Sequence, residues 1–198
     1  MIEELILATH NQGKVHEFEV MLDGLVGKLS SALEHKLEEP EETETTFTGN
    51  ALLKARVACK ATGLPCLADD SGLCVDGLEG APGIYSARWA ETPKGRDFDI
   101  AMQRIHDELS GIDGTQTAYF MVVLALVYPS GQEEIFEGRI DGKLCWPARG
   151  EQGHGYDPIF IAEGYDISFA EMEVAKKNAI SHRAIAVEKL KKYLSENE

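Results

Sequence analysis

The order of apolar and polar segments at the amino terminus constrains the fold more than any other feature of this sequence. Residues 4–8, Glu-Leu-Ile-Leu-Ala, read as a short buried strand. A polar loop follows, and apolar side chains then recur at helical spacing: Val15, Phe18, Leu22 and Leu25. A strand that leads through a short loop into an amphipathic helix is typical of α/β proteins.

The alternation continues along the chain. Helical spacing over residues 47–58 is ended by Gly63 and Pro65, and residues 66–70 read as a short strand that runs straight into two carboxylates. A glycine-rich segment, residues 71–89, comes next. Residues 97–109 are predicted to be helical, with Ile100, Ile105 and Leu109 on one side.

The later part of the chain predicts a hairpin and a final helix. Residues 117–128 and 134–140 are the best strand candidates, and a turn containing proline and glycine joins them. Ser181 is placed to cap a last amphipathic helix. We therefore expect an elongated α/β fold with a mixed sheet, in which two lobes flank a central substrate cleft.

The charge of the chain limits its partners. There are 34 acidic and 19 basic residues among 198, a formal net charge of −15. This balance argues against binding to nucleic acid or to an anionic membrane through a basic surface. The longest apolar stretch, residues 119–128, is too short to span a membrane, and no secretory signal is evident. We expect a cytoplasmic protein.

The four cysteines predict neither a metal site nor disulfides. They form no Cys-x-x-Cys pair and have no histidine at ligand spacing. We expect Cys59, Cys66, Cys74 and Cys145 to be buried small apolar residues.

The first segment with chemical character is residues 9–14, between the first strand and the first helix. A helix amino terminus offers unpaired N–H groups to a phosphate, Gly13 permits a close approach, and Lys14 adds a charge. The glycine spacing of a Walker loop is missing. A plain connection between strand and helix remains the alternative.

The second segment is the Asp69–Asp70 pair at the end of a predicted strand. Adjacent strand residues point to opposite faces, so we expect the two carboxylates to have different roles. Carboxylates without softer neighbours suit Mg²⁺, and Glu42 in the acidic stretch of residues 34–44 is a candidate second ligand. A solvated acidic surface is the alternative reading of that stretch.

Two further segments lie in the last third of the chain. Residues 153–158 combine glycines with His154 and Tyr156, which could form a flat slot for a planar base or simply a tight turn. Residues 176–183 begin a basic concentration in an acidic chain, with His182 and Arg183 just before the last helix. The later lysines of that helix are explained by the helix dipole alone.

Taken together, these segments resemble the inosine triphosphate pyrophosphatase family, in particular its bacterial XTP/dITP diphosphatase branch. The resemblance covers nearly the whole chain, and the residues that carry it occur in order: 7–14, 42–43, 46–47, 50–51, 54–56, 68–73, 80–88, 155–158 and 177–183. No single segment is decisive, but their joint occurrence is highly specific.

The resemblance implies a single nucleoside-triphosphate pyrophosphatase domain over residues 1–198, which forms a homodimer and requires Mg²⁺. It implies hydrolysis between the α- and β-phosphates. Asp70 matches the proposed general base and metal ligand, Glu42 a metal-side carboxylate, and Ser71 a substrate contact. The triphosphate would be held by Thr9, His10, Asn11, Gln12, Gly13, Lys14, Lys54 and Lys177. The base pocket would be formed by His154, Gly155, Tyr156, Asp157, His182 and Arg183.

The sequence departs from the family pattern at two positions. Gly49 stands where the family commonly has glutamate, so a carboxylate is lost there. His154 stands where phenylalanine is common, which leaves less apolar area to stack on a purine. A Maf-like nucleotide pyrophosphatase with another base preference and a catalytically silent nucleotide-binding regulator are the alternative functions.

Overall fold

The computed structural model describes residues 2–112 and 116–197, and it confirms a mixed α/β fold. The main sheet has six strands in the order β2-β1-β3-β6-β7-β8. These strands span Leu5–Leu7 (β1), Leu29–Ser31 (β2), Cys66–Val75 (β3), Thr117–Val127 (β6), Glu133–Leu144 (β7) and Phe160–Ala162 (β8). A separate two-stranded sheet pairs Glu91–Thr92 (β4) with Gly95–Arg96 (β5).

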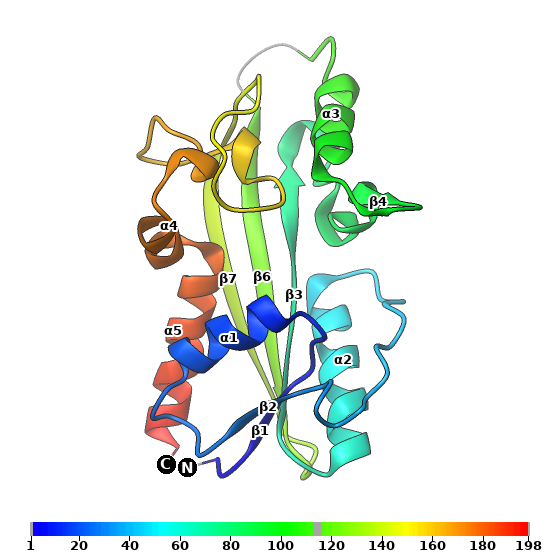
Figure 1. Cartoon of the computed structure of the whole chain (residues 1–198), viewed down its shortest axis with the longest axis vertical. Coiled ribbons are helices and arrows are strands. Elements are labelled where there is room, and N and C mark those ends of the chain that lie inside the picture. The colour runs from blue at the N-terminus through cyan, green and yellow to red at the C-terminus, as the bar shows by residue number, and fades with distance from the viewer. Residues whose placement is uncertain (1, 113–115, 198) are drawn as a thin grey trace. The chain divides into compact units, whose positions relative to one another are not determined.

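The helices are interleaved with these strands (Figure 1). They span Gln12–Met21 (α1), Phe47–Thr62 (α2), Phe98–Glu108 (α3), Val174–Ile180 (α4) and His182–Glu196 (α5). Short 3-10 helices occupy Asp76–Leu78, Gly83–Tyr85, Arg88–Ala90, Asp157–Ile159 and Phe169–Glu171. Among the residues described, no helix combines the length and the apolarity needed to cross a membrane.

The chain divides into two compact units, each assembled from separate stretches of sequence. Unit 1 comprises residues 1–70, 122–138 and 185–198, and unit 2 comprises residues 71–121 and 139–184. Strands β3, β6 and β7 therefore each contribute residues to both units. Each unit has its own hydrophobic core.

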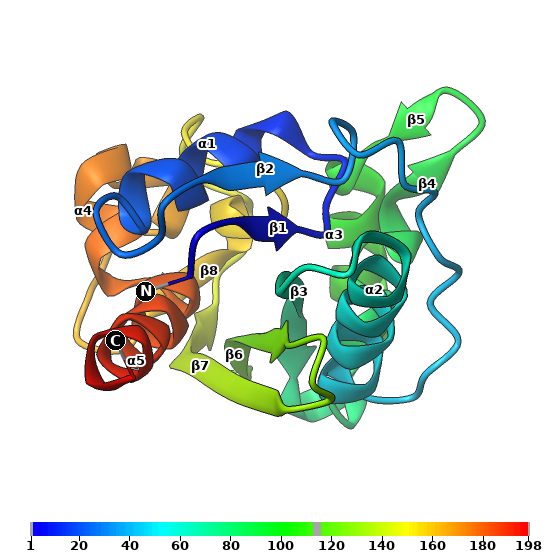
Figure 2. The same ribbon diagram turned by 90° about the horizontal axis from the view of Figure 1, so that it is seen from below.

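Unit 1 contains the parallel part of the sheet. Strand β1 pairs in parallel with β2 on one side and with β3 on the other, and Leu5, Leu7 and Leu67 lie fully buried in its core. Helices α1 and α2 and the part of α5 from Ile185 onward belong to this unit, and Figure 2 shows α1 running alongside β2. The buried face of α1, with Val15 and Phe18, packs into the same core, as the helical spacing predicts.

Several boundaries agree closely with the sequence. Thr46 caps α2. Gly63 ends the helix in a left-handed backbone conformation that residues with a Cβ atom adopt less easily. Strands β6 and β7 are neighbours in the sheet and are joined by the predicted turn, in which the Tyr128 N–H donates to the Gln132 carbonyl. Ser181 caps the last helix by accepting a hydrogen bond from the Ala184 N–H at 3.2 Å.

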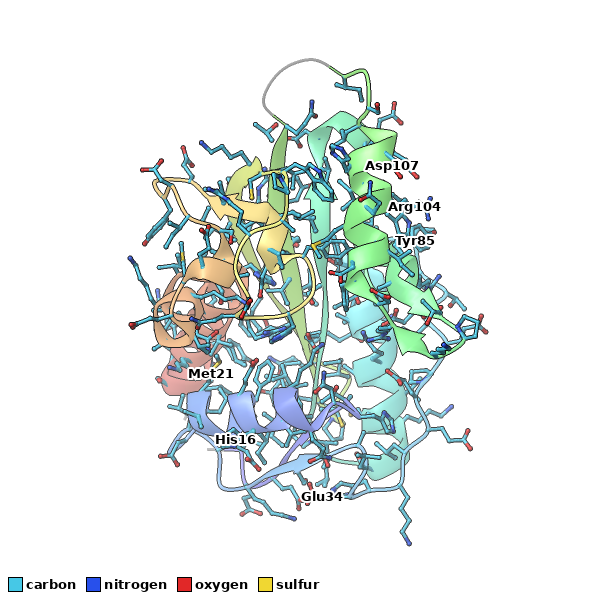
Figure 3. All side chains as sticks on the ribbon, turned by 45° about the horizontal axis from the view of Figure 1, so that its top comes forward. His16, Met21, Glu34, Tyr85, Arg104 and Asp107 are labelled. Atoms are coloured by element: carbon cyan, nitrogen blue, oxygen red, sulfur yellow. The ribbon has the colours of Figure 1, made fainter. Side chains whose placement is uncertain are left out.

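Two expectations were wrong. Strand β3 does not stop at the two aspartates but continues to Val75. Helix α3 buries Ala101, Met102 and Ile105, whereas Ile100 is 53% exposed. Its outer face carries Arg104 and Asp107 (Figure 3), and the Arg104 guanidinium covers the Trp89 ring at 3.6 Å.

The cysteine prediction is confirmed for three of the four positions. Cys59, Cys66 and Cys74 are buried, and burial raises the pKa of the Cys66 thiol to about 12, so this group stays neutral. Cys145, directly after β7, is only partly buried, and its thiol donates to the Pro158 carbonyl at 3.5 Å.

Candidate active site

The predicted site residues fall in both units. Residues 9–14, Glu42, Lys54 and Asp70 belong to unit 1, whereas Ser71, residues 154–157, Lys177, His182 and Arg183 belong to unit 2.

In unit 1, Asp69 and Asp70 have different partners, as expected for neighbours on a strand. The Lys14 ammonium donates to both oxygens of Asp69, at 2.7 and 2.9 Å. The Asp70 carboxylate instead accepts from Asn50 Nδ2 and from Lys54 Nζ, each at 3.4 Å. The alternation of strand side chains thus directs one carboxylate to the first helix and the other to α2.

Lys54 is shared by two carboxylates. Its ammonium lies 2.6 Å from Glu42 Oε1 and 3.4 Å from Asp70 Oδ1, and only 10% of its side chain is exposed. Burial alone would lower the pKa of Lys54, but Asp70, Asp69 and Glu42 outweigh burial and raise it. Lys54 is therefore a buried, charged ammonium at neutral pH.

Asp70 is the carboxylate whose acidity the protein changes most clearly. Burial raises its pKa to about 6, against the opposing effect of the Lys54 ammonium, and the negative charges of Glu42 and Asp69 add to the increase. A carboxylate with a pKa near neutrality can accept a proton from water more effectively than an ordinary aspartate can. Such perturbed groups are concentrated at functional sites.

Asn50 is a site residue that the sequence reasoning did not assign. It is fully buried on the first turn of α2, where its Oδ1 accepts from the Glu44 N–H at 3.1 Å while its Nδ2 donates to Asp70. It therefore connects the acidic segment to the Asp70 carboxylate. The available signal was its position in the motif four residues after the helix cap.

Gly49 allows the acidic segment to lie close to α2. A Cβ added at this position would lie 2.7 Å from the Glu44 Cβ, which is closer than real side chains approach. The absence of a side chain at position 49 thus leaves room for Glu44 beside the helix.

Side-chain oxygens of the loop of residues 9–14 accept hydrogen bonds from several of the loop's own backbone N–H groups. Asn11 caps α1, because its Oδ1 accepts from the N–H groups of Gly13 and Lys14 at 2.9 and 3.3 Å. Thr9 Oγ1 accepts from the Asn11 N–H at 3.2 Å. An anion at this helix terminus would therefore share or replace the Asn11 oxygen.

His10 contacts the acidic segment in this structure. Its Nε2 donates to the Leu37 carbonyl at 2.8 Å, which joins the loop of residues 9–14 to the segment that leads to Glu42. A cavity of about 20 Å³ lies beside His10, Leu37 and Lys54, which is room for a single water molecule. The sequence placed His10 among the triphosphate contacts; the structure adds this contact with the scaffold.

In unit 2, Asp157 organises the turn of residues 153–158. Its carboxylate is buried and accepts from the His154 N–H at 2.9 Å and from the Lys177 ammonium, on α4. Tyr156 is also buried, and its hydroxyl donates to the Ser86 carbonyl at 2.7 Å. The His154 side chain is exposed.

His182 and Arg183 lie at the start of α5. The His182 ring stacks on Phe120 with 5.0 Å between ring centroids and 12° between planes. Both His182 and Arg183 are partly buried. This stacking fixes the orientation of the imidazole beside a buried aromatic ring.

The residues of unit 1 fit a divalent cation. Within the described part of the chain, no three His, Cys, Asp or Glu side chains gather to form a complete ligand set. Mg²⁺ needs only one or two protein carboxylates, since water and phosphate oxygens supply the rest. The Lys54 ammonium already stands between Glu42 and Asp70 as a cation, which shows that this pair of carboxylates can hold positive charge.

The fold and the site define a mixed α/β protein with a buried centre of lysines and carboxylates, of the kind that binds polyphosphates. A family model described as the Ham1 family matches residues 5–193. The chain belongs to this family, which confirms the resemblance seen in the sequence.

Curated relatives resemble the chain over nearly its full length. The dITP/XTP pyrophosphatase of Ruegeria pomeroyi is 53% identical over 96% of this chain and 94% of its own length. That of Caulobacter vibrioides is 52% identical over 95% and 96%. The solved HAM1 protein of Coxiella burnetii has a TM-score of 0.92 at 37% identity, over 98% of this chain and all of the other.

Proposed function

We propose that this chain is a nucleoside-triphosphate pyrophosphatase that removes deaminated purine nucleotides, dITP, XTP and ITP, from the nucleotide pool. The observation that carries the proposal is that relatives more than 50% identical over nearly the whole chain are named dITP/XTP pyrophosphatases. The reaction adds water across the bond between the α- and β-phosphates. It gives the nucleoside monophosphate and pyrophosphate. The oxygen of the water molecule becomes bonded to the phosphorus atom that the water attacks.

The residues of unit 1 supply what this chemistry needs. Phosphoanhydride cleavage depends on positioning and on neutralising the charge of the phosphate oxygens. Lys14 and Lys54 provide positive charge in this unit, and the raised pKa of Asp70 suits it to take the proton of the attacking water. We propose Asp70 as the catalytic base, acting on water directly or through the metal.

Enzymes of this class generally need a divalent metal ion, and we propose Mg²⁺ held by Glu42 and Asp70. When bound, the ion would neutralise phosphate charge and increase the acidity of water. Unit 1 needs such a charge, because Glu42, Asp69 and Asp70 outnumber Lys14 and Lys54. A triphosphate would otherwise meet a site with excess negative charge.

We propose that the remaining predicted residues bind the substrate. Residues 9–14 with Lys54, Ser71 and Lys177 would contact the phosphates. Residues 154–157 with His182 and Arg183 would contact the base. A hypoxanthine offers an O6 acceptor and an N1–H donor, and a site that hydrogen-bonds to them would reject adenine because buried groups would be left unpaired.

We further propose that residues 1–198 act as one catalytic domain in a cytoplasmic homodimer that does not bind nucleic acid. The net charge of −15 supports the last point, because a polyanion would be repelled except where lysines and a metal ion focus positive charge. Size-exclusion chromatography with light scattering tests the dimer, for which the expected mass is twice 21.7 kDa.

The substrate proposal is tested by measuring pyrophosphate release from dITP, XTP, ITP, dATP, dGTP and dTTP, with and without Mg²⁺. We expect kcat/KM for dITP, XTP and ITP to exceed that for dATP and dGTP by at least about 100-fold, as hydrogen-bond readout allows. Preferential cleavage of dTTP would favour a Maf-like activity. Absence of Mg²⁺-dependent release from all six nucleotides would favour a nucleotide-binding regulator.

A further inference from the structure

The ammonium of Lys54 occupies the place between the two carboxylates of the proposed metal site. It lies 2.6 Å from Glu42 Oε1 and 3.4 Å from Asp70 Oδ1. The three side chains come from different parts of unit 1: Lys54 from α2, Asp70 from β3, and Glu42 from the irregular acidic segment. The lysine therefore joins α2, β3 and the acidic segment through two ion pairs.

A lysine in this position and a metal ion on the same oxygens exclude one another. Mg²⁺ binds oxygen ligands at about 2.1 Å and tolerates little distortion of its octahedral geometry. A second cation within hydrogen-bond distance of the same carboxylates would be repelled strongly in a buried setting, where charges are poorly screened. Lys54 must therefore release these carboxylates before they can act as metal ligands.

We propose that Lys54 is an internal counter-cation that a divalent metal ion displaces from Glu42 and Asp70, which frees the lysine to bind a substrate phosphate. The inference rests on the proposed function and adds an order of events to it. In the metal-free protein the lysine neutralises the two carboxylates. After displacement, its ammonium needs a new anionic partner, and the triphosphate supplies one.

Lys14 offers a matched comparison within the same unit. It also pairs with a buried carboxylate, but that carboxylate is Asp69, at 2.7 Å, which is not a proposed metal ligand. Metal binding at Glu42 and Asp70 leaves the Lys14–Asp69 pair intact. Removing the charge of Lys14 should therefore affect metal affinity much less than removing the charge of Lys54.

The test measures the affinity of the full substrate-free chain for Mg²⁺ by isothermal titration calorimetry, with Mn²⁺ and electron paramagnetic resonance as a second probe. Lys54→Met keeps the length of the side chain and removes its charge. We expect this variant to bind the metal at least about tenfold more tightly than the wild type. Lys54→Arg, which keeps the charge, should not bind more tightly, and Lys14→Met should stay within about threefold of the wild type.

Unchanged or weaker metal binding by Lys54→Met would overturn the proposal. Equal tightening in Lys14→Met would also overturn it, because the effect would then reflect only the total charge of the site. Circular dichroism checks that each variant is folded, and Lys54→Gln replaces the methionine variant if that one is not. Absence of metal binding by every protein counts against the proposal as well.

The experiments distinguish a failure of the displacement proposal from a failure of the proposed function. If Lys54→Met tightens metal binding but the wild type releases no pyrophosphate from dITP or XTP, the counter-cation role stands and the substrate assignment fails. If the wild type hydrolyses dITP with Mg²⁺ but Lys54→Met does not tighten metal binding, the enzyme assignment stands and the displacement fails.

Discussion

The two units hold their buried carboxylate–lysine groups in different ways. In unit 1, Glu42 and Asp70 share the single ammonium of Lys54, and the pKa of Asp70 is raised to about 6, chiefly by burial. In unit 2, Asp157 pairs with Lys177 one to one and also accepts from the His154 N–H. The first group has a surplus of negative charge and the second is balanced. A surplus of buried carboxylates favours a site that recruits a cation, whereas a balanced pair favours a scaffold that positions a lysine.

The largest difference should appear when one carboxylate of each group is neutralised. Glu42→Gln should lower kcat/KM for dITP by about 100-fold, because it removes a proposed metal ligand. Raising the Mg²⁺ concentration should recover part of that loss. Asp157→Asn should lower kcat/KM by about tenfold, mainly through KM, because Lys177 loses its positioning partner.

Steady-state assays across a range of Mg²⁺ concentrations compare the two variants. A loss in Asp157→Asn that Mg²⁺ restores, or one in Glu42→Gln that it does not, would reverse the roles given to the two units.

Stability should change with opposite signs at the two positions. Because the pKa of Asp70 is higher in the folded protein than the usual 3.8, the folded state binds more protons between about pH 4 and pH 6. The unfolding free energy contributed by this group therefore falls as pH rises through that window. In metal-free protein at pH 7, Asp70→Asn should raise the unfolding free energy by about 1–3 kcal/mol, and the gain should vanish near pH 4.

Asp157→Asn should instead lower the unfolding free energy by about 2–4 kcal/mol, because it leaves the buried end of Lys177 without a counter-charge. Urea titrations in the presence of a chelator measure both variants. Destabilisation by Asp70→Asn at pH 7 would show that the contacts of the Asp70 carboxylate stabilise the fold by more than its burial costs.

A smaller effect is expected at the start of α5. Arg183→Ala should lower ITP turnover by about tenfold, as loss of a hydrogen bond to the base would. Pyrophosphate binding, measured by competitive inhibition, should change by less than about threefold. Equal losses in both measurements would make Arg183 a phosphate contact and remove it from base recognition.

The elements could be predicted well from the sequence where local rules determine them. Gly63 ends α2 because only a residue without Cβ adopts its left-handed conformation easily, and Ser181 caps α5 through its own hydroxyl. The end of β3 was not predictable in this way. Its continuation past Asp70 through Ser71 and Gly72 depends on pairing with neighbouring strands, and no local pattern records that pairing.

The site shows the same division between local and long-range information. Opposite directions for Asp69 and Asp70 follow from the geometry of a strand and are confirmed by their different partners. The contacts of Lys54 with Glu42 and of His10 with Leu37 join residues 12 and 27 positions apart through the path of an irregular segment. Such a path depends on packing and has no signature in hydrophobic periodicity.

The most direct test of the account is pyrophosphate release from dITP by Asp70→Asn beside the wild type, at neutral pH with saturating Mg²⁺. We predict a folded variant whose kcat is lower by at least about 1,000-fold, because the change removes both the proposed base and a proposed metal ligand. A folded variant that retains kcat within about tenfold of the wild type would show that the reaction does not depend on this carboxylate, and would contradict the account at its centre.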